Sequence, residues 1–325
     1  MKKQLLFFFL ILSTLLVSCS PTKSPYLSIT VTAGEGDQLL STTYEYDLST
    51  KKLLMRGQVP YTSQYPLTAV DVKRQVIYYT GRDQSGLADQ LQVYDLTSKQ
   101  SQTLTTDLFA INELFVIDKQ VVLAASSKKA TDNHIMPLAS YDLDHKQFQF
   151  WWDPNKEDTT VKFAKPIPGT NRLYAGLYSF GESFTNLEKA NQLQLQDGAE
   201  PPLYTVFEFD DRGNKIKKWF ETKEELPFFA LSSDQKQAFY SSATTTFTPR
   251  SYQFLELATS SKTPFTPFEQ ISDAFFEPGD QGLLLLGTYQ KKRGVYRYDL
   301  QSKEVTLLME EPTKAFINNL TLMEK

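Results

Sequence analysis

Short stretches of alternating apolar and polar residues recur along the chain, and most of them end in the same phrase. The phrase is an aromatic residue or leucine, then an acidic residue and often leucine, followed by a polar turn. Its copies are Tyr46-Asp47-Leu48, Tyr94-Asp95-Leu96, Tyr141-Asp142-Leu143, Phe209-Asp210, Leu255-Glu256-Leu257 and Tyr298-Asp299-Leu300. Period-two alternation predicts β-strands, and Asp or Ser in a polar turn predicts a hairpin, because their side chains bond nearby backbone amides.

The copies of this phrase are regularly spaced. The residues before the acids stand at 46, 94, 141, 209, 255 and 298, so the intervals are 48, 47, 68, 46 and 43 residues. A second hairpin pattern precedes most copies, as in residues 69–79 and 114–123. Two hairpins per interval make four strands, which is typical of a β-propeller blade. We therefore predict an all-β fold, a six-bladed propeller of four-stranded blades.

The two ends of the predicted propeller complement each other. Residues 27–32 read as the second strand of a first blade that lacks its innermost strand, and residues 316–322 read as a strand without a blade. We expect the C-terminal strand to complete the first blade, because such closure removes exposed sheet edges. The prediction is one propeller domain over residues 26–325. An open β-sandwich is the alternative, and the regular period speaks against it.

The amino terminus has the layout of a secretory signal over residues 1–18. Lys2 and Lys3 precede an apolar stretch that ends near Val17 and is short for a membrane-spanning helix. The stretch Leu16-Val17-Ser18-Cys19 resembles a lipobox, the recognition sequence of the bacterial lipoprotein signal peptidase. This resemblance implies lipid attachment to Cys19, cleavage before it, and a tether over residues 19–25. The alternative is an ordinary signal peptide with an accidental cysteine.

The repeat architecture resembles the broad group of bacterial six-bladed propellers, including Tol-type and related lipoprotein propellers, over roughly residues 26–325. The resemblance carries no catalytic residue to this chain. Together with the lipobox it implies a lipid-anchored protein on the extracytoplasmic side of the cell membrane.

Longer connections are expected between the second and third strands of the blades, in residues 81–89, 126–137, 178–202, 242–250 and 289–294. In a propeller these connections share one face, and loops carry function more often than strands. We predict that this is the binding face. The longest connection is expected to hold a short helix over Leu187 to Leu195, capped by Ser183 or Thr185. It is either a partner-binding flap or a tolerated insertion.

Candidate partner-binding residues on this face are basic or aromatic. They are Arg82, Lys128, Lys129, His134, Phe180, Phe184, Arg250, Lys292 and Arg293, with Lys291 beside them. The basic residues either bind an anionic group or are solvated loop tips beside acids.

Composition and motifs narrow the function. The net charge of −4 and pI near 5.4 speak against a nucleic-acid partner. One cysteine, two histidines and no catalytic or metal motif lead us to expect no catalytic residues, metal or cofactor. We expect a monomeric binding or scaffold protein for a protein or cell-envelope polymer. The alternative is an extracellular hydrolase or lyase with a site in the central funnel.

Overall fold

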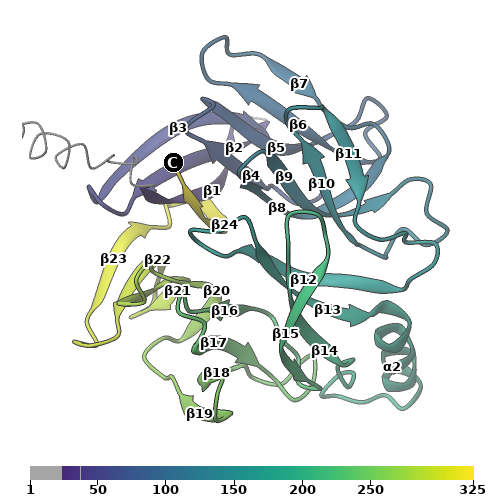
Figure 1. The fold of residues 1–325 in the computed structure, drawn as a ribbon, viewed down its shortest axis with the longest axis vertical. Coiled ribbons are helices and arrows are strands. Elements are labelled where there is room, and N and C mark those ends of the chain that lie inside the picture. The colour runs from purple at the N-terminus through teal and green to yellow at the C-terminus, as the bar shows by residue number, and fades with distance from the viewer. Residues whose placement is uncertain (1–23, 37) are drawn as a thin grey trace, which may run out of the picture.

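The computed structural model describes residues 24–36 and 38–325, which form six four-stranded antiparallel sheets in a ring (Figure 1). The chain is a six-bladed β-propeller, as predicted. The single helix of the described residues, α2 (Phe180–Gln192), lies at the outer edge of the ring beside β13 and β14. The predicted signal segment, Leu16, Val17, Ser18 and Cys19 all lie outside the described residues.

Within each blade the strands follow one another outward from a central channel. Blade 1 consists of β24 (Ala315–Glu324), β1 (Pro25–Glu35), β2 (Gln38–Asp47) and β3 (Lys52–Pro60). Blade 2 consists of β4 (Thr68–Asp71), β5 (Val76–Arg82), β6 (Asp89–Asp95) and β7 (Ser101–Thr103). Blade 3 consists of β8 (Leu108–Ile117), β9 (Gln120–Ser127), β10 (Leu138–Asp142) and β11 (Gln147–Phe150). Blade 4 consists of β12 (Thr159–Pro166), β13 (Leu173–Ser179), β14 (Tyr204–Phe209) and β15 (Lys215–Thr222). Blade 5 consists of β16 (Phe229–Leu231), β17 (Gln237–Ser242), β18 (Ser251–Glu256) and β19 (Ser261–Pro264). Blade 6 consists of β20 (Gln270–Phe276), β21 (Gly282–Tyr289), β22 (Lys292–Asp299) and β23 (Val305–Glu310).

Blade 1 is closed by the two ends of the propeller. The C-terminal strand β24 is its innermost strand and pairs antiparallel with β1, placing Leu27 opposite Leu322 and Ile29 opposite Leu320. All four side chains are at most 2% exposed. This confirms the predicted closure, and both strands are longer than the predicted 27–32 and 316–322.

One face of the ring, here called the turn face, carries the short connections between first and second and between third and fourth strands. Five of its turns between third and fourth strands begin with an aspartate whose Oδ1 accepts backbone amides of the turn: Asp47, Asp95, Asp142, Asp210 and Asp299. These bonds stabilise the charged carboxylate, and the amide of Ser98 contributes most to the lowered pKa of Asp95. The Asp phrases are therefore turn-forming, as predicted.

The opposite face, here called the loop face, carries the connections between second and third strands and between blades. Its longest connections between second and third strands are residues 83–88, 128–137, 180–203 and 243–250. The prediction of a longer connection over Tyr289 to Gly294 is wrong. Gln290 and Lys291, at φ 49° and 65°, form a two-residue hairpin turn, and Lys292 begins β22.

The apolar core lies between neighbouring blades. In one cluster Leu27 and Ile29 of β1 pack with Leu284 of β21, which joins blades 1 and 6. In another, Leu91 of β6 packs with Leu123 of β9 and joins blades 2 and 3. Because each sheet buries both faces against its neighbours, the blades form a closed ring around the channel.

Candidate functional site

A wide groove on the loop face brings together two segments that are far apart in sequence. It has a volume of about 850 Å³ and lies between the connection 128–137 of blade 3 and helix α2 of blade 4. Its lining residues are Phe109, Lys128, Ala130, Thr131, Asp132, Asn133, His134, Phe180, Phe184 and Leu187. Four of the predicted partner-binding residues, Lys128, His134, Phe180 and Phe184, therefore share one site.

Aromatic rings run in a row along this groove. The His134 and Phe180 rings stack at 5.5 Å with an angle of 4° between their planes, and Phe180 and Phe184 stack at 6.2 Å. The outer end of the row remains accessible, since Phe184 is 50% exposed and Leu187, on the helix beside it, is 46% exposed. The groove thus offers apolar surface that the propeller does not cover.

Helix α2 is held by a cap that the sequence analysis placed wrongly. We predicted a helix over Leu187 to Leu195 capped by Ser183 or Thr185. In the structure the helix spans Phe180–Gln192, and its N-terminal cap is Ser179. The Ser179 Oγ accepts a bond of 3.0 Å from the Glu182 amide and donates to Asp158. The spacing of Ser179 and Glu182 is that of a capping box, a signal present in the sequence.

The facing segment of the groove is ordered by Asp132. Its Oδ1 accepts the His134 backbone amide at 2.9 Å and lies 2.8 Å from the His134 Nδ1. The backbone bond is the main cause of the lowered pKa of Asp132. At the same loop the Asn155 Oδ1 accepts the Thr131 amide at 2.8 Å. The His134 ring is therefore held against Phe180 from its own loop.

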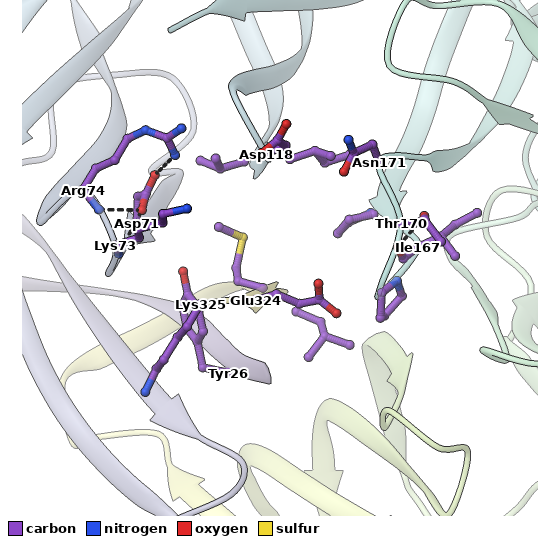
Figure 2. Close-up of a pocket in the computed structure, with 16 residues that line it drawn as sticks. Tyr26, Asp71, Lys73, Arg74, Asp118, Ile167, Thr170, Asn171, Glu324 and Lys325 are labelled. Carbon is purple, nitrogen blue, oxygen red and sulfur yellow. Dashed lines mark hydrogen bonds and ion pairs between the residues drawn. The ribbon is translucent and has the colours of Figure 1, made fainter. Parts of the chain in front are cut away.

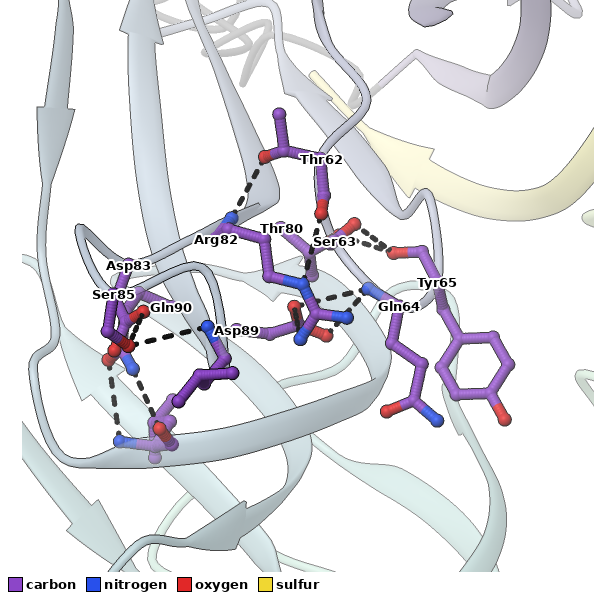
Figure 3. A network of polar contacts seen from close by, with 12 residues as sticks. Thr62, Ser63, Gln64, Tyr65, Thr80, Arg82, Asp83, Ser85, Asp89 and Gln90 are labelled. Atoms are coloured by element: carbon purple, nitrogen blue, oxygen red, sulfur yellow. Dashed lines mark hydrogen bonds and ion pairs between the residues drawn. The ribbon is translucent and has the colours of Figure 1, made fainter.

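Arg82 serves the packing of blade 2 (Figure 3). Its guanidinium lies 3.1 Å from the fully buried Asp89 and donates to the Thr62 carbonyl. Asp89 also accepts the Gln64 amide, so the pair ties the connection 61–67 to the β5–β6 hairpin. Burial raises the pKa of Asp89, opposed by the Gln64 amide and Arg82.

The other predicted basic residues lie on different blades and mostly face carboxylates. Lys128 pairs with Asp83 at 2.5 Å, Lys129 with Asp107 at 2.6 Å, Lys292 with Glu310 at 3.4 Å and Arg293 with Glu311 at 3.0 Å. Arg250 lies exposed at the start of β18. The structure brings only Lys128 into the groove, so the other basic residues do not form one cluster with it.

The central channel holds a separate cavity of about 400 Å³ on the loop-face side. Glu113, Lys165 and Asp273 line it from three different innermost strands. Lys165 pairs with Asp273 and donates to the Ala274 carbonyl at 2.6 Å. Burial, with help from Asp273 and against Lys165, raises the pKa of Glu113 to about 8. Of the two histidines, both in the described chain, neither lines this cavity.

A smaller cavity of about 100 Å³ lies at the turn-face end of the channel (Figure 2). The Asp71–Arg74 pair stands on one side of it, Thr170 and Asn171 on another, and Glu324 in between. The Glu324 carboxylate accepts the Gly169 amide at 2.6 Å, which ties the last strand to blade 4. The sequence analysis did not single out this end of the channel.

The described residues contain no group of three or more His, Cys, Asp or Glu side chains placed to hold a metal ion. Within the same part of the chain, no helix is long and apolar enough to span a membrane.

Comparison with known proteins supports the fold. No family model matches the chain. The uncharacterized protein YdjN of Bacillus subtilis (strain 168) is 22% identical over 312 residues, 87% of either chain. Among solved structures, TolB from Acinetobacter baumannii has a TM-score of 0.59 at 12% identity, over 92% of this chain and 66% of that one. A chain of a nidogen/laminin complex has a TM-score of 0.57 at 11% identity, over 92% and 98%. An oligogalacturonate lyase in complex with manganese has a TM-score of 0.50 at 12% identity, over 83% and 74%. At these identities the likeness to solved structures is one of fold, that of the β-propeller.

Proposed function

We propose that this chain is a lipid-anchored, extracytoplasmic binding protein that holds a partner protein in the loop-face groove between residues 128–137 and α2. The observation that carries the proposal is the accessible apolar row in that groove, which ends in Phe184 and Leu187, 50% and 46% exposed. Apolar surface of this kind is uncommon on a soluble protein unless it meets a partner.

The composition of the groove favours a protein over a polar envelope polymer. Five of its ten lining residues are apolar, three of them phenylalanines, and the others include Lys128 and Asp132. Protein–protein interfaces are enriched in aromatic residues, and a few aromatic anchors supply most of the binding energy. The fold likeness to a chain of a nidogen/laminin complex is consistent with a binding role.

The start of the described chain supports the anchoring part of the proposal. Ser24 and Pro25 lie on the turn face, where the Ser24 carbonyl accepts the Lys325 amide and the Pro25 carbonyl accepts the Leu48 amide. Cys19 precedes Ser24 by five positions, a span of at most about 18 Å. A lipid on Cys19 would therefore hold the turn face toward the membrane and leave the loop face directed away from it.

The partner-binding part is tested with a matched pair of variants of the full-length chain in its own cells. Leu187→Asp changes the groove, and Ile216→Asp changes an equally exposed residue on the outermost strand of the same blade, at 48% exposure. After crosslinking and pull-down, we expect Leu187→Asp to lower recovery of a discrete partner about tenfold or more, because a charge replaces an apolar contact. Ile216→Asp should leave recovery unchanged. Equal recovery from both variants would overturn the groove as the binding site.

The anchoring part is tested by Cys19→Ala. We expect this variant to be released from the membrane fraction or to remain as uncleaved precursor. Unchanged processing together with unchanged membrane fractionation would contradict the anchor.

A further inference from the structure

Four innermost strands carry a β-bulge beside the 400 Å³ cavity. In each, a polar residue that follows a branched aliphatic residue lacks a partner on the neighbouring strand, and β8 has a second bulge at Phe109. The polar bulged residues are Asn112 of β8, Lys162 of β12, Ser272 of β20 and Asn318 of β24. All four line the cavity. A bulge re-aims a side chain and is common next to binding sites, so its repetition indicates a built site.

The bulges of two blades are braced against each other by Arg293. Its Nη1 donates to the Ser272 Oγ at 3.1 Å, and its Nη2 donates to the Ile317 carbonyl at 3.2 Å, beside Asn318. The Asn318 Oδ1 in turn accepts a bond of 2.7 Å from the Thr32 hydroxyl. Arg293 is therefore a positioning residue for this cavity.

The cavity has nearly balanced charge. Lys165 pairs with Asp273, and Lys162 pairs with Glu225 at 2.5 Å. Glu113 and Tyr65 are the remaining titratable groups that line the cavity, and with its raised pKa Glu113 is mostly protonated at neutral pH. The site thus presents hydrogen-bond donors and acceptors without a net charge to attract an ion.

An accessible aromatic ring completes the site. At the mouth of the cavity Tyr65 is 45% exposed. The volume falls in the range of small-molecule sites. Amide, hydroxyl and carboxyl groups beside an aromatic ring suit a ligand with many hydroxyls and an apolar ring face.

We propose that this cavity binds an uncharged sugar unit, with Asn112, Glu113 and Asn318 as hydrogen-bonding partners and the Tyr65 ring at the entrance. The site is separate from the α2 groove, since no residue lines both. Loss of one function would therefore leave the other intact.

The test is calorimetric titration of the full-length chain, purified in a detergent without a sugar headgroup. The probes are glucose, N-acetylglucosamine and maltose, with galacturonate as the charged comparison. At pH 6.5 we expect a neutral sugar to bind and galacturonate to bind at least tenfold more weakly. Absence of heat from all three neutral sugars at millimolar concentration, or preference for galacturonate, would overturn the proposal.

Variants assign the binding to the cavity. Asn112→Ala should weaken the neutral sugar at least threefold, whereas Asn171→Ala, at the opposite end of the channel, should not change its affinity. Raising the pH to 9.5 should weaken binding to the unaltered chain on the order of tenfold, as Glu113 loses its proton, and should not weaken binding to Glu113→Gln. Equal effects of Asn112→Ala and Asn171→Ala, or the same pH response in Glu113→Gln, would contradict the assignment.

Discussion

The two faces of this propeller are built from the same four-stranded unit and differ in how freely their connections vary. On the turn face, repeated aspartates bind the backbone amides of short turns, as Asp95 binds those of Thr97 and Ser98. On the loop face the same strands are joined by anything from the two-residue turn at 290–291 to the 24-residue segment 180–203. Groove and channel cavity are both reached from the loop face. The repeated blade thus keeps the same turn geometry on the turn face, whereas the loop face varies in length and holds both the groove and the entrance to the channel cavity.

Carboxyl groups that accept turn amides differ in pKa from carboxyl groups that lie buried in the protein. On the turn face, the amide of Ser302 and Arg297 lower the pKa of Asp299 to about 2. On the loop-face side, burial raises the pKa of Asp89 and of Glu113. The turn carboxylates are held in their charged form by donors, whereas Asp89 is enclosed by protein and Glu113 faces the channel cavity. The contrast separates turn-forming acids from acids that are buried in the blades or the channel.

The largest expected effect comes from breaking the closure on which both faces depend. Removing residues 315–325 deletes β24 and exposes the partners of Ile317, Leu320 and Leu322, each at most 2% exposed. At roughly 1.5–3 kcal/mol per buried side chain, the loss is comparable to the whole stability of a domain. We expect no cooperative thermal unfolding transition in calorimetry. A truncated chain that still unfolds cooperatively would show that blade 1 does not need β24.

A smaller effect distinguishes two basic residues of the loop face. Arg82→Ala leaves the buried Asp89 without its cation and should cost about 2–4 kcal/mol in urea unfolding. Lys129→Ala removes a pair whose side chains are 73% and 61% exposed and should cost less than about 1 kcal/mol. Equal losses would mean that Arg82 does not hold blade 2 together.

The channel acid gives a stability effect with a defined pH dependence. The pKa of Glu113 is raised in the folded state, so its proton stabilises the fold fully below pH 4.5, and this contribution is lost as the pH rises toward 8. Glu113→Gln should remove this decline and raise the Tm at pH 8 by about 1–2 °C, equivalent to about 1 kcal/mol. Parallel Tm profiles of the two chains between pH 5 and 8 would contradict the burial of Glu113.

The smallest expected change in stability comes from the longest loop. Deleting residues 181–200 removes nearly all of α2, in which Ala190 is the only buried residue. The ends of β13 and β14 lie side by side, since Leu177 pairs with Thr205, so the shortened loop can still join them. We expect a cost below about 1 kcal/mol in urea unfolding. A chain that no longer folds would show that α2 belongs to the core and is not an added binding element.

The sequence predicts the fold well because the blade repeats its turn phrase, and each Asp marks the same turn. It predicts the site less well. The helix start was missed although Ser179 and Glu182 have capping-box spacing, and the turn at 290–291 lacks the glycine or asparagine that usually marks such a hairpin. The channel residues were missed because a bulge shifts the strand register, and no single strand pattern reveals which polar residue then faces the channel.

The central claim is that the loop face binds a protein while the turn face lies toward the membrane. Its most direct test is photo-crosslinking in intact cells, with a photoreactive residue placed either at Leu187 in the groove or at His145, exposed in a turn of the opposite face. We predict a discrete protein adduct from position 187 that Phe184→Asp abolishes, and no such adduct from position 145. A protein adduct from position 145 alone, or one at position 187 that survives Phe184→Asp, would contradict the account.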